Sequence, residues 1–241
     1  MTWSIVARDK TSGHFGIAVA TCFFAAGALV PYGRSRVGAI ATQALVNPFF
    51  GTDGLRLLEQ GRSAQEVASA LTEADPGRDL RQVHLIDGLG RVAAYTGSAC
   101  DGWSGHVAGD NLSIAGNMLA GSDVIACTAA CYERDAGLSF PRRLIAAMRA
   151  GEAAGGDKRG KQSAALVIYG EEEWPDLNLR VDDHPDPLAE LERLEGVSRE
   201  AFVPFQRLLP SRADPVGVID RRLIESDIAR TLSASPADRR E

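Results

Sequence analysis

The first twenty-one residues predict a β-hairpin at the start of the chain. Two apolar segments, 2–9 and 15–21, flank the polar segment 10–14, which contains Gly13. Apolar segments on both sides of a short turn with glycine are typical of two antiparallel strands. Only Met1 precedes the first of them. We therefore expect a fold whose first strand starts beside the chain terminus.

Thr2 is the residue on which the functional interpretation depends. Methionine aminopeptidase removes Met1 when the next residue is as small as threonine, so we expect Thr2 to carry a free α-amine. A threonine hydroxyl becomes an effective nucleophile when a base lies beside it, and a terminal amine on the same residue is one such base. Taken alone, position 2 is more simply explained by tolerance of a small residue. The order of the predicted elements is what favours a nucleophile.

Charge and hydropathy limit the classes of partner. A net charge of -6 provides no basic surface for nucleic acid. The longest apolar stretch, 15–30, is interrupted by Gly16, Thr21 and Gly27 and is followed by Pro31, so it does not predict a membrane span. The N-terminus lacks the basic segment and hydrophobic core of a secretory signal. We expect a cytoplasmic protein with no nucleic-acid or membrane partner.

The cysteines and histidines do not predict a metal site. Cys127 and Cys131 are four residues apart on a predicted helix and would supply half of one, but small buried cysteines are more common. The four histidines are far apart and form no ligand pair. Three aspartates near residue 184 are interpreted as a solvated linker: Asp182, Asp183 and Asp186. We expect neither a metal nor a cofactor.

The order of predicted elements indicates a layered fold. Besides the hairpin, strands are expected at 36–43, 82–87, 91–96, 112–117, 163–169 and 177–181, and helices at 52–61, 63–75, 122–133 and 140–148. Residues 22–31 are expected to be a loop or an irregular strand. Sheets with an apolar face must be covered, and paired helices after runs of strands provide that cover. The fold class is therefore α+β, a four-layer α-β-β-α sandwich of two mainly antiparallel sheets.

The chain changes character after residue 183. Residues 183–187 form a stiff, acidic, proline-containing connector, and the leucines that follow recur at helical spacing. The polar tail from Ser233 onward is expected to fray. We divide the chain into a domain at 1–183 and a helical extension at 184–241. The extension is expected to pack on the domain or on another subunit, in a homodimer or higher homo-oligomer.

Several motifs resemble those of known families. The hairpin is similar to the start of the mature catalytic subunit in N-terminal nucleophile (Ntn) hydrolases, particularly isoaspartyl peptidases and proteasome β subunits. Residues 114–121 resemble the glycine-serine turn before a helix in proteasome subunits, and Asp157 with 162–165 resembles their aspartate-then-serine segment. Those subunits have an aspartate where this chain has Thr21. They also have a lysine near the nucleophile, which has no equivalent here; Arg36, at the start of the third predicted strand, is the nearest cation.

A second resemblance, to the DUF1028 family, covers about residues 1–193. The matching stretches are 3–9, 41–44 with 47–48, 155–157 with 160 and 162–165, and 179–187. This resemblance implies the Ntn-type fold, and the family carries no established activity.

The two resemblances imply an N-terminal-threonine amidohydrolase or peptidase that acts on a small amide or peptide. Thr2 would be the nucleophile, with Asp157 and Ser163 orienting its amine. Further residues are expected to hold the oxyanion or the substrate: Thr21, Thr42, Gln43, Asn47 and Asn117, with Arg8 or Arg36 on a substrate carboxylate. For Asn47, formation of a turn with Pro48 explains the residue equally well.

Two other interpretations remain open. A non-catalytic member would retain Met1 and use the fold to bind a ligand or to assemble. Catalysis by Cys22, at the edge of the same sheet as Thr2, is the second. Residues 155–162 are not a phosphate-binding loop, because Gln162 replaces the required hydroxyl and the segment is expected to lie between a helix and a strand rather than the reverse.

Overall fold

The computed structural model describes residues 2–233, so Met1 and residues 234–241 of the predicted tail lie outside the described residues. The chain divides into two compact units, 1–191 and 192–241, whereas the predicted domain ends at 183. None of the helices within 2–233 is long and apolar enough to cross a membrane.

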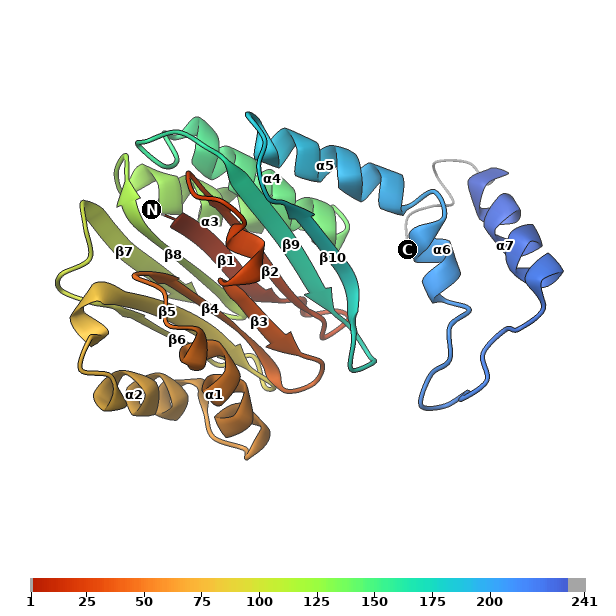
Figure 1. Cartoon of the computed structure of the whole chain (residues 1–241), viewed down its shortest axis with the longest axis horizontal. Coiled ribbons are helices and arrows are strands. Elements are labelled where there is room, and N and C mark those ends of the chain that lie inside the picture. The colour runs from red at the N-terminus through yellow and green to blue at the C-terminus, as the bar shows by residue number, and fades with distance from the viewer. Residues whose placement is uncertain (1, 234–241) are drawn as a thin grey trace. The chain divides into compact units, whose positions relative to one another are not determined.

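Two antiparallel sheets form the centre of the first unit (Figure 1). The larger sheet has the order β10-β9-β2-β1-β8-β7 and the smaller sheet the order β3-β4-β5-β6. The larger sheet comprises β1 (Thr2–Arg8), β2 (Phe15–Thr21), β7 (Trp103–Gly109), β8 (Leu112–Leu119), β9 (Ser163–Tyr169) and β10 (Pro175–Val181). The smaller sheet comprises β3 (Pro31–Arg34), β4 (Gly38–Ala44), β5 (Arg81–Asp87) and β6 (Val92–Thr96). The first strand, β1, is central because β2 and β8 pair with its two edges.

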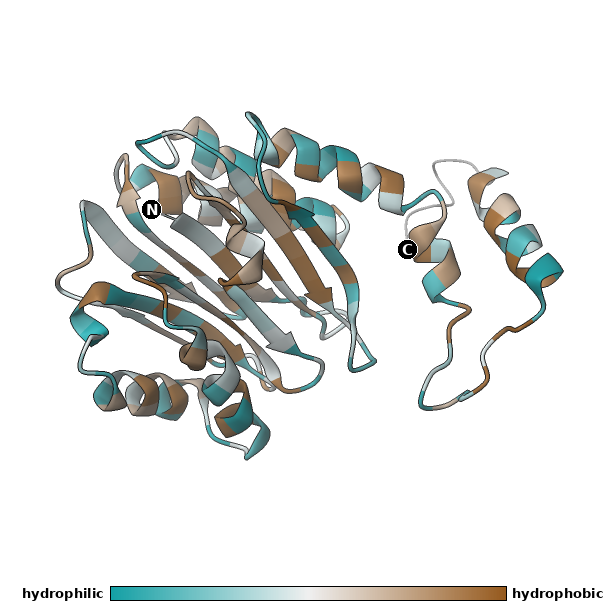
Figure 2. Ribbon diagram, viewed as in Figure 1, coloured by the Kyte–Doolittle hydropathy of each residue, from teal (hydrophilic) through white to brown (hydrophobic). Residues whose placement is uncertain are grey.

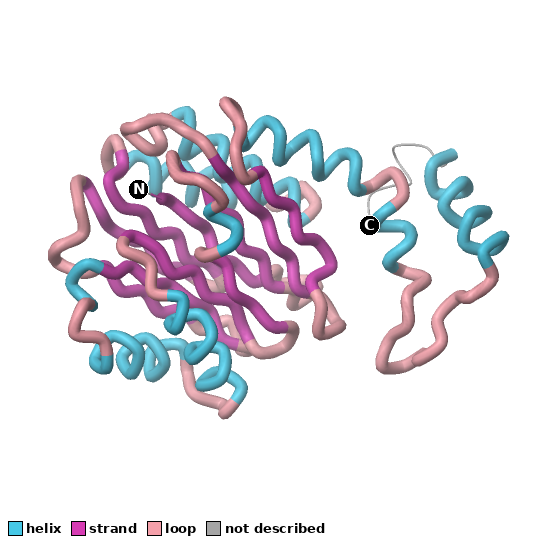
Figure 3. Tube along the Cα trace, in the orientation of Figure 1, coloured by secondary structure: helices cyan, strands magenta, loops and turns pink. Residues whose placement is uncertain are grey.

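Helix pairs cover the outer faces of the sheets. On the smaller sheet lie α1 (Pro48–Glu59) and α2 (Ala64–Ala74), and on the larger sheet α3 (Asp123–Arg134) and α4 (Phe140–Ala153). Figure 3 shows the strands inside and the helices outside. Figure 2 shows both hydrophobic and hydrophilic residues along α1 and α2, as expected of helices with one face on a sheet. The predicted four-layer α-β-β-α sandwich is confirmed.

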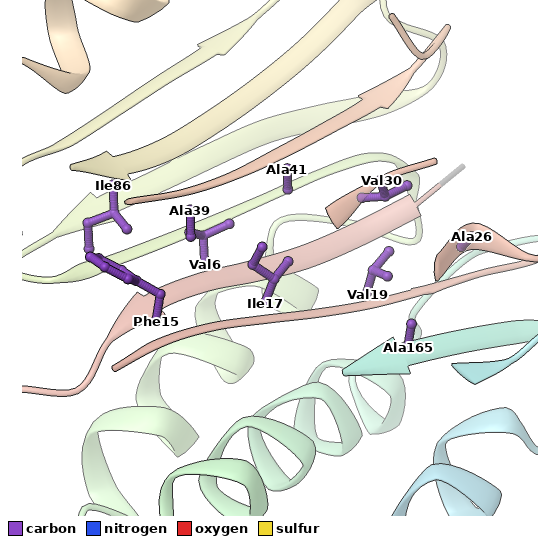
Figure 4. Packing of buried hydrophobic residues seen from close by; sticks show 10 residues of the cluster. All are labelled: Val6, Phe15, Ile17, Val19, Ala26, Val30, Ala39, Ala41, Ile86 and Ala165. Atoms are coloured by element: carbon purple, nitrogen blue, oxygen red, sulfur yellow. The ribbon is translucent and has the colours of Figure 1, made fainter. Parts of the chain in front are cut away.

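The layer between the two sheets contains an apolar cluster. Phe15, Ile17 and Val19 of β2 pack against β4 and β5 residues such as Ala39 and Ile86 (Figure 4). Because side chains alternate along a strand, these residues identify the faces that the sheets turn toward each other. In Figure 4, Phe15 and Ile86 lie at one end of this cluster and Val30 and Ala26 at the other.

Two strands were missed by the sequence analysis, β3 and β7. The edge strand β7 is largely exposed, and its sequence has no regular apolar alternation. β3 is four residues long and contains Gly33. The sequence predicted runs of three strands before each helix pair, and the structure has four. Edge strands bury little surface, so their sequences are less restricted than those of central strands.

The start of the first helix differs from its prediction. Asn47, not Thr52, is the N-cap of α1, and its Oδ1 accepts a hydrogen bond from the amide of Phe49 at 3.1 Å. Pro48 occupies the first helical turn, where its missing N–H costs nothing. The predicted capping box of α2 is confirmed, with Ser63 and Glu66 bonded reciprocally.

The extension is helical, as predicted. α5 (Pro187–Ser198) begins in the first unit, and α6 (Phe202–Gln206) and α7 (Arg221–Ser233) lie in the second. Within α7 no residue is buried.

Candidate functional site

The end of the inter-sheet layer at which β1 begins is polar. Val6 faces the smaller sheet, so the alternation of β1 turns Thr2 and Ser4 toward the same side. The strand registers bring further polar residues of both sheets to this end: Thr21, Asn117 and Ser163 from the larger sheet, and Gln43, Gln82 and Thr96 from the smaller sheet. We call this group the polar end. It lies at the opposite end of the inter-sheet layer from Phe15 and Ile86.

Thr2 is held at the polar end by both of its neighbouring strands. Its Oγ1 donates to the hydroxyl of Thr21 at 3.2 Å, and its carbonyl accepts from Asn117 Nδ2 at 3.4 Å. Thr2 is 8% exposed, and Thr21 and Asn117 are 1% exposed. The structure thus brings together three of the residues that the sequence analysis had assigned to the site.

Asp157 and Ser163 contact the loop that follows Thr21. Asp157 Oδ2 accepts from the amide of Cys22 at 2.9 Å, and the carboxylate also pairs with Arg159 at 3.2 Å. Ser163 Oγ donates to the carbonyl of Phe23 at 2.6 Å. Both side chains are buried, and the backbone groups that they contact lie within two residues of Thr21 along the chain. Their predicted role in orienting the amine of Thr2 stays a prediction, whereas their hold on the loop is direct.

Thr42 and Gln43 cannot both face the site. They are neighbours on β4, so their side chains point to opposite faces of the smaller sheet. Gln43 belongs to the polar end, where its Nε2 donates to Gln82 Oε1 at 2.7 Å. The hydroxyl of Thr42 donates instead to the carbonyl of Asn47 at 3.2 Å. The prediction that Thr42 holds the oxyanion through its hydroxyl is therefore corrected.

Asn47 serves the helix rather than the site. Besides capping α1, its Nδ2 donates to Asp75 Oδ2 at 3.1 Å. Of the two explanations that the sequence left open, local turn and cap formation accounts for both polar atoms of this side chain, Oδ1 and Nδ2.

The two predicted substrate arginines lie at the opposite end of the sandwich. Arg8 ends β1, six residues after Thr2, which corresponds to a separation of about 20 Å along an extended strand. Arg36 lies in the turn before β4 and pairs with Glu171 at 2.7 Å, with most of its side chain exposed. Neither can reach a substrate that is bound at Thr2, because strand direction places them far away.

A hydrogen-bonded network behind Thr2 was not predicted. Gln82 is its centre: Oε1 accepts from Gln43 and from Asn117, while Nε2 donates to the hydroxyl of Thr96 at 2.9 Å. The same Nε2 lies 2.9 Å from the carbonyl of Gly116 in the larger sheet. The signal that could have revealed this network is the alternation of β5, where Gln82 and His84 are polar residues on one face of an otherwise apolar strand.

His84 follows Gln82 by two residues on the same face of β5 and connects the two sheets. Its Nε2 lies 2.7 Å from Ser4 Oγ, and its Nδ1 lies 3.0 Å from Ser113 Oγ. The imidazole is completely buried, and this burial lowers its pKa to about 3, with His106 as a smaller cause. His84 is therefore neutral in the folded protein at neutral pH.

We predict that His84 makes the protein less stable in acid. In the unfolded chain it titrates near its ordinary pKa of 6.5, and in the folded chain near 3. Between these values the unfolded state binds the extra proton, so the free energy of unfolding falls as pH decreases, by up to about 1.4 kcal/mol per pH unit. Denaturant unfolding of wild type and His84→Gln between pH 4 and 7 measures this slope. Equal slopes in the two proteins would contradict the assignment.

Cys22 adjoins the site without entering the network. Its amide donates to Asp157, and its Sγ lies 3.8 Å from the carbonyl of Arg159. The thiol is partly exposed and forms no disulfide.

The three aspartates near residue 184 have local partners. Asp182 pairs with Arg180, Asp186 pairs with Lys161, and Gln162 donates to Asp183. Among residues 2–233, no group of three or more His, Cys, Asp or Glu is arranged to hold a metal ion. The glycine-rich segment 155–160 follows α4 and precedes β9, which is the reverse of a phosphate-binding loop.

The chain is similar to a known protein family and to solved structures. Residues 2–191 match the model of a family of unknown function, DUF1028. The crystal structure of a protein of that family from Silicibacter pomeroyi is 32% identical, covers 91% of this chain and 96% of its own, and superposes with a TM-score of 0.84. Anbu (ancestral beta-subunit) from Yersinia bercovieri is 14% identical, covers 87% of this chain and 98% of its own, and has a TM-score of 0.36. No curated protein matched the sequence.

Proposed function

We propose, from the premise that this chain belongs to the DUF1028 family, that it hydrolyses a small amide or peptide bond with Thr2 as the nucleophile. The observation that carries the proposal is the position of Thr2. It is the first described residue of a central strand, and its hydroxyl lies 3.2 Å from that of Thr21 at the polar end of the inter-sheet layer. A nucleophile needs a fixed hydroxyl, a base and neighbouring polar groups at one place.

The proposed reaction begins with the removal of Met1, which leaves an α-amine on Thr2. That amine takes the proton from Oγ1 as the oxygen forms a bond to the carbonyl carbon of the substrate. Collapse of the tetrahedral intermediate breaks the C–N bond, and the leaving amine receives the proton. Water then attacks the acyl-enzyme ester with the same amine as base. The products are a carboxylic acid, a free amine and the restored Thr2.

The neighbouring groups of Thr2 suit this reaction. The hydroxyl of Thr21 contacts Oγ1 directly and fixes its position. Gln43 brings a side-chain amide to the same end. One of its two N–H groups donates to Gln82, and the proposal assigns the other to the oxyanion. Asn117 also fixes the carbonyl of Thr2, so the nucleophile is oriented from two strands.

The proposal includes a cytoplasmic location and a homo-oligomeric state.

The test is a pair of proteins that differ only in front of Thr2. One carries an N-terminal tag that is cleaved to leave Thr2 as the first residue, and the other carries the same tag uncleaved. Hydrolysis of small amides and dipeptides should appear only after cleavage, because the tag removes the base but leaves the hydroxyl.

Intact mass of the untagged protein completes this test. Loss of Met1 agrees with the proposal, whereas retention of Met1 together with an absence of turnover supports a non-catalytic binding or assembly protein. Equal activity of the cleaved and uncleaved proteins would exclude Thr2 amine catalysis. Inactivation of both by a thiol reagent, together with loss of activity in Cys22→Ala, would then identify Cys22 as the nucleophile.

A further inference from the structure

The loop that follows β2 exposes two consecutive phenylalanines beside the site. Phe23 is 61% exposed and Phe24 is 60% exposed, whereas Phe15 and Phe50 of the same unit are almost completely buried. Single exposed apolar residues are common, but two adjacent large aromatic rings in water form a surface that needs an explanation.

The backbone that carries these two rings is fixed by buried polar groups. The amide of Cys22 is held by Asp157 at 2.9 Å and the carbonyl of Phe23 by Ser163 at 2.6 Å. Ser163 Oγ also accepts from the amide of Ala26 at 3.1 Å. Asp157 and Ser163 are at most 5% exposed, so the loop is anchored from inside the fold.

The conformation of the loop supports the same conclusion. Ala25 has a φ of 54°, a left-handed conformation that costs energy for a residue other than glycine. Its amide donates to the carbonyl of Asp182 at 3.0 Å, which holds the strained residue in place. Strain that the surrounding structure maintains is typical of sites where side chains must be presented in one position. The rings of Phe23 and Phe24 are therefore exposed on a fixed backbone.

The loop also connects the two sheets beside the polar end. It starts at Thr21, whose hydroxyl contacts Thr2, and it ends at Val30, whose carbonyl accepts from the amide of Thr42 in the smaller sheet at 3.1 Å. Because one residue spans at most about 3.6 Å, the Cα atom of Phe23 lies within about 7 Å of that of Thr21. This distance corresponds to one or two residues of a bound peptide.

The charges beside the loop are paired with one another. Asp157 is paired with Arg159 and Asp182 with Arg180, at 3.2 and 2.9 Å. A surface of two aromatic rings between neutralised ion pairs suits an apolar group better than an acidic or a basic one.

We propose that Phe23 and Phe24 bind the substrate, and that the substrate carries a large apolar or aromatic group next to the bond that is hydrolysed. This inference rests on the proposed function and adds a substrate class to it. The two rings are specificity-determining residues, and Asp157 and Ser163 act through them as positioning residues.

The experiment compares phenylalanine anilides with alanine anilides in wild type, Phe23→Ala, Phe24→Ala and the double variant. We expect kcat/KM for the phenylalanine substrate to fall roughly 10- to 100-fold in the double variant, mainly through KM. The alanine substrate should change less than about 3-fold, since it makes little contact with the rings. Leucine in place of both phenylalanines should restore part of the loss. Phe202→Ala, at an exposed aromatic residue of the second unit, is the matched control and should leave kcat/KM unchanged for both substrates.

Binding measured without turnover separates this inference from the proposed function. Calorimetric titration of Thr2→Ala with N-acetylphenylalanine amide should show binding that is lost when both phenylalanines are also replaced. If Thr2→Ala still hydrolyses the substrates, the proposed function fails while the binding result stands. Equal losses of kcat/KM for both anilides, or unchanged kinetics in the double variant, would overturn the proposal that Phe23 and Phe24 bind the substrate. So would a change from oligomer to monomer in the double variant without a change in discrimination, because the rings would then be an interface between copies of this chain.

Discussion

Replacing Thr2 with alanine is expected to lower kcat/KM at least about 10³-fold while leaving the fold intact. The variant removes the attacking oxygen, and no neighbouring hydroxyl carries an α-amine of its own. The thermal cost is small, because within residues 2–233 Oγ1 makes one hydrogen bond, to Thr21, whose net contribution is about 1 kcal/mol. For a chain of this size that corresponds to a fall in Tm of roughly 2–4 °C.

Two variants make this result specific. Thr2→Ser keeps both the hydroxyl and the amine and should retain measurable turnover. Thr11→Ala removes a threonine from the exposed turn after β1 and should change neither activity nor melting. The measurement is steady-state hydrolysis with a melting curve for each protein. Wild-type turnover in Thr2→Ala, with the protein folded, would remove Thr2 from the mechanism.

Replacing Gln82 with leucine is expected to cause the largest loss of stability, about 3–5 kcal/mol in the free energy of unfolding. Gln82 is completely buried, and leucine would leave the amide groups of Gln43 and Asn117 without their shared acceptor. The hydroxyl of Thr96 and the carbonyl of Gly116 would lose a donor. Each buried polar group without a partner costs about 1–3 kcal/mol.

Denaturant unfolding and thermal melting measure this effect, and a fall in Tm of roughly 10–15 °C is expected. The matched control is Gln65→Leu on the exposed face of α2, which should stay within about 0.5 kcal/mol of wild type. A loss as small as that of the control would mean that water or rearranged side chains replace the bonds of Gln82. The network would then not be what holds Asn117 beside Thr2.

The parts of the fold that follow local rules could be predicted from the sequence. The hairpin β1–β2 was identified from its apolar segments and turn, and the start of α2 from its capping box. The strands β3 and β7 could not be, because edge strands are short or exposed and do not need a regular apolar pattern. The start of α1 was misplaced because Thr52 and Asn47 are both good caps, and only the fold shows at which of them the helix begins.

The site was predicted less completely. Thr2 was found from its position directly after Met1, and Thr21 and Asn117 through the resemblance to known enzymes. The three residues do meet. Arg8 and Arg36 were chosen for their charge, which gives no information on which end of a strand a substrate approaches. Gln82 and His84 were missed because their significance depends on the opposite sheet.

The sequence by itself determined which residues pair locally and which faces of the strands are apolar, because alternation and capping depend on neighbours within a few positions. The tertiary structure alone decided that the polar positions of seven strands converge at one end of the inter-sheet layer, around Thr2. Residues as far apart as Thr2, Gln82 and Asn117 meet only when two sheets stack in one register. That register is set by the packing of the whole core and by no single segment of the chain.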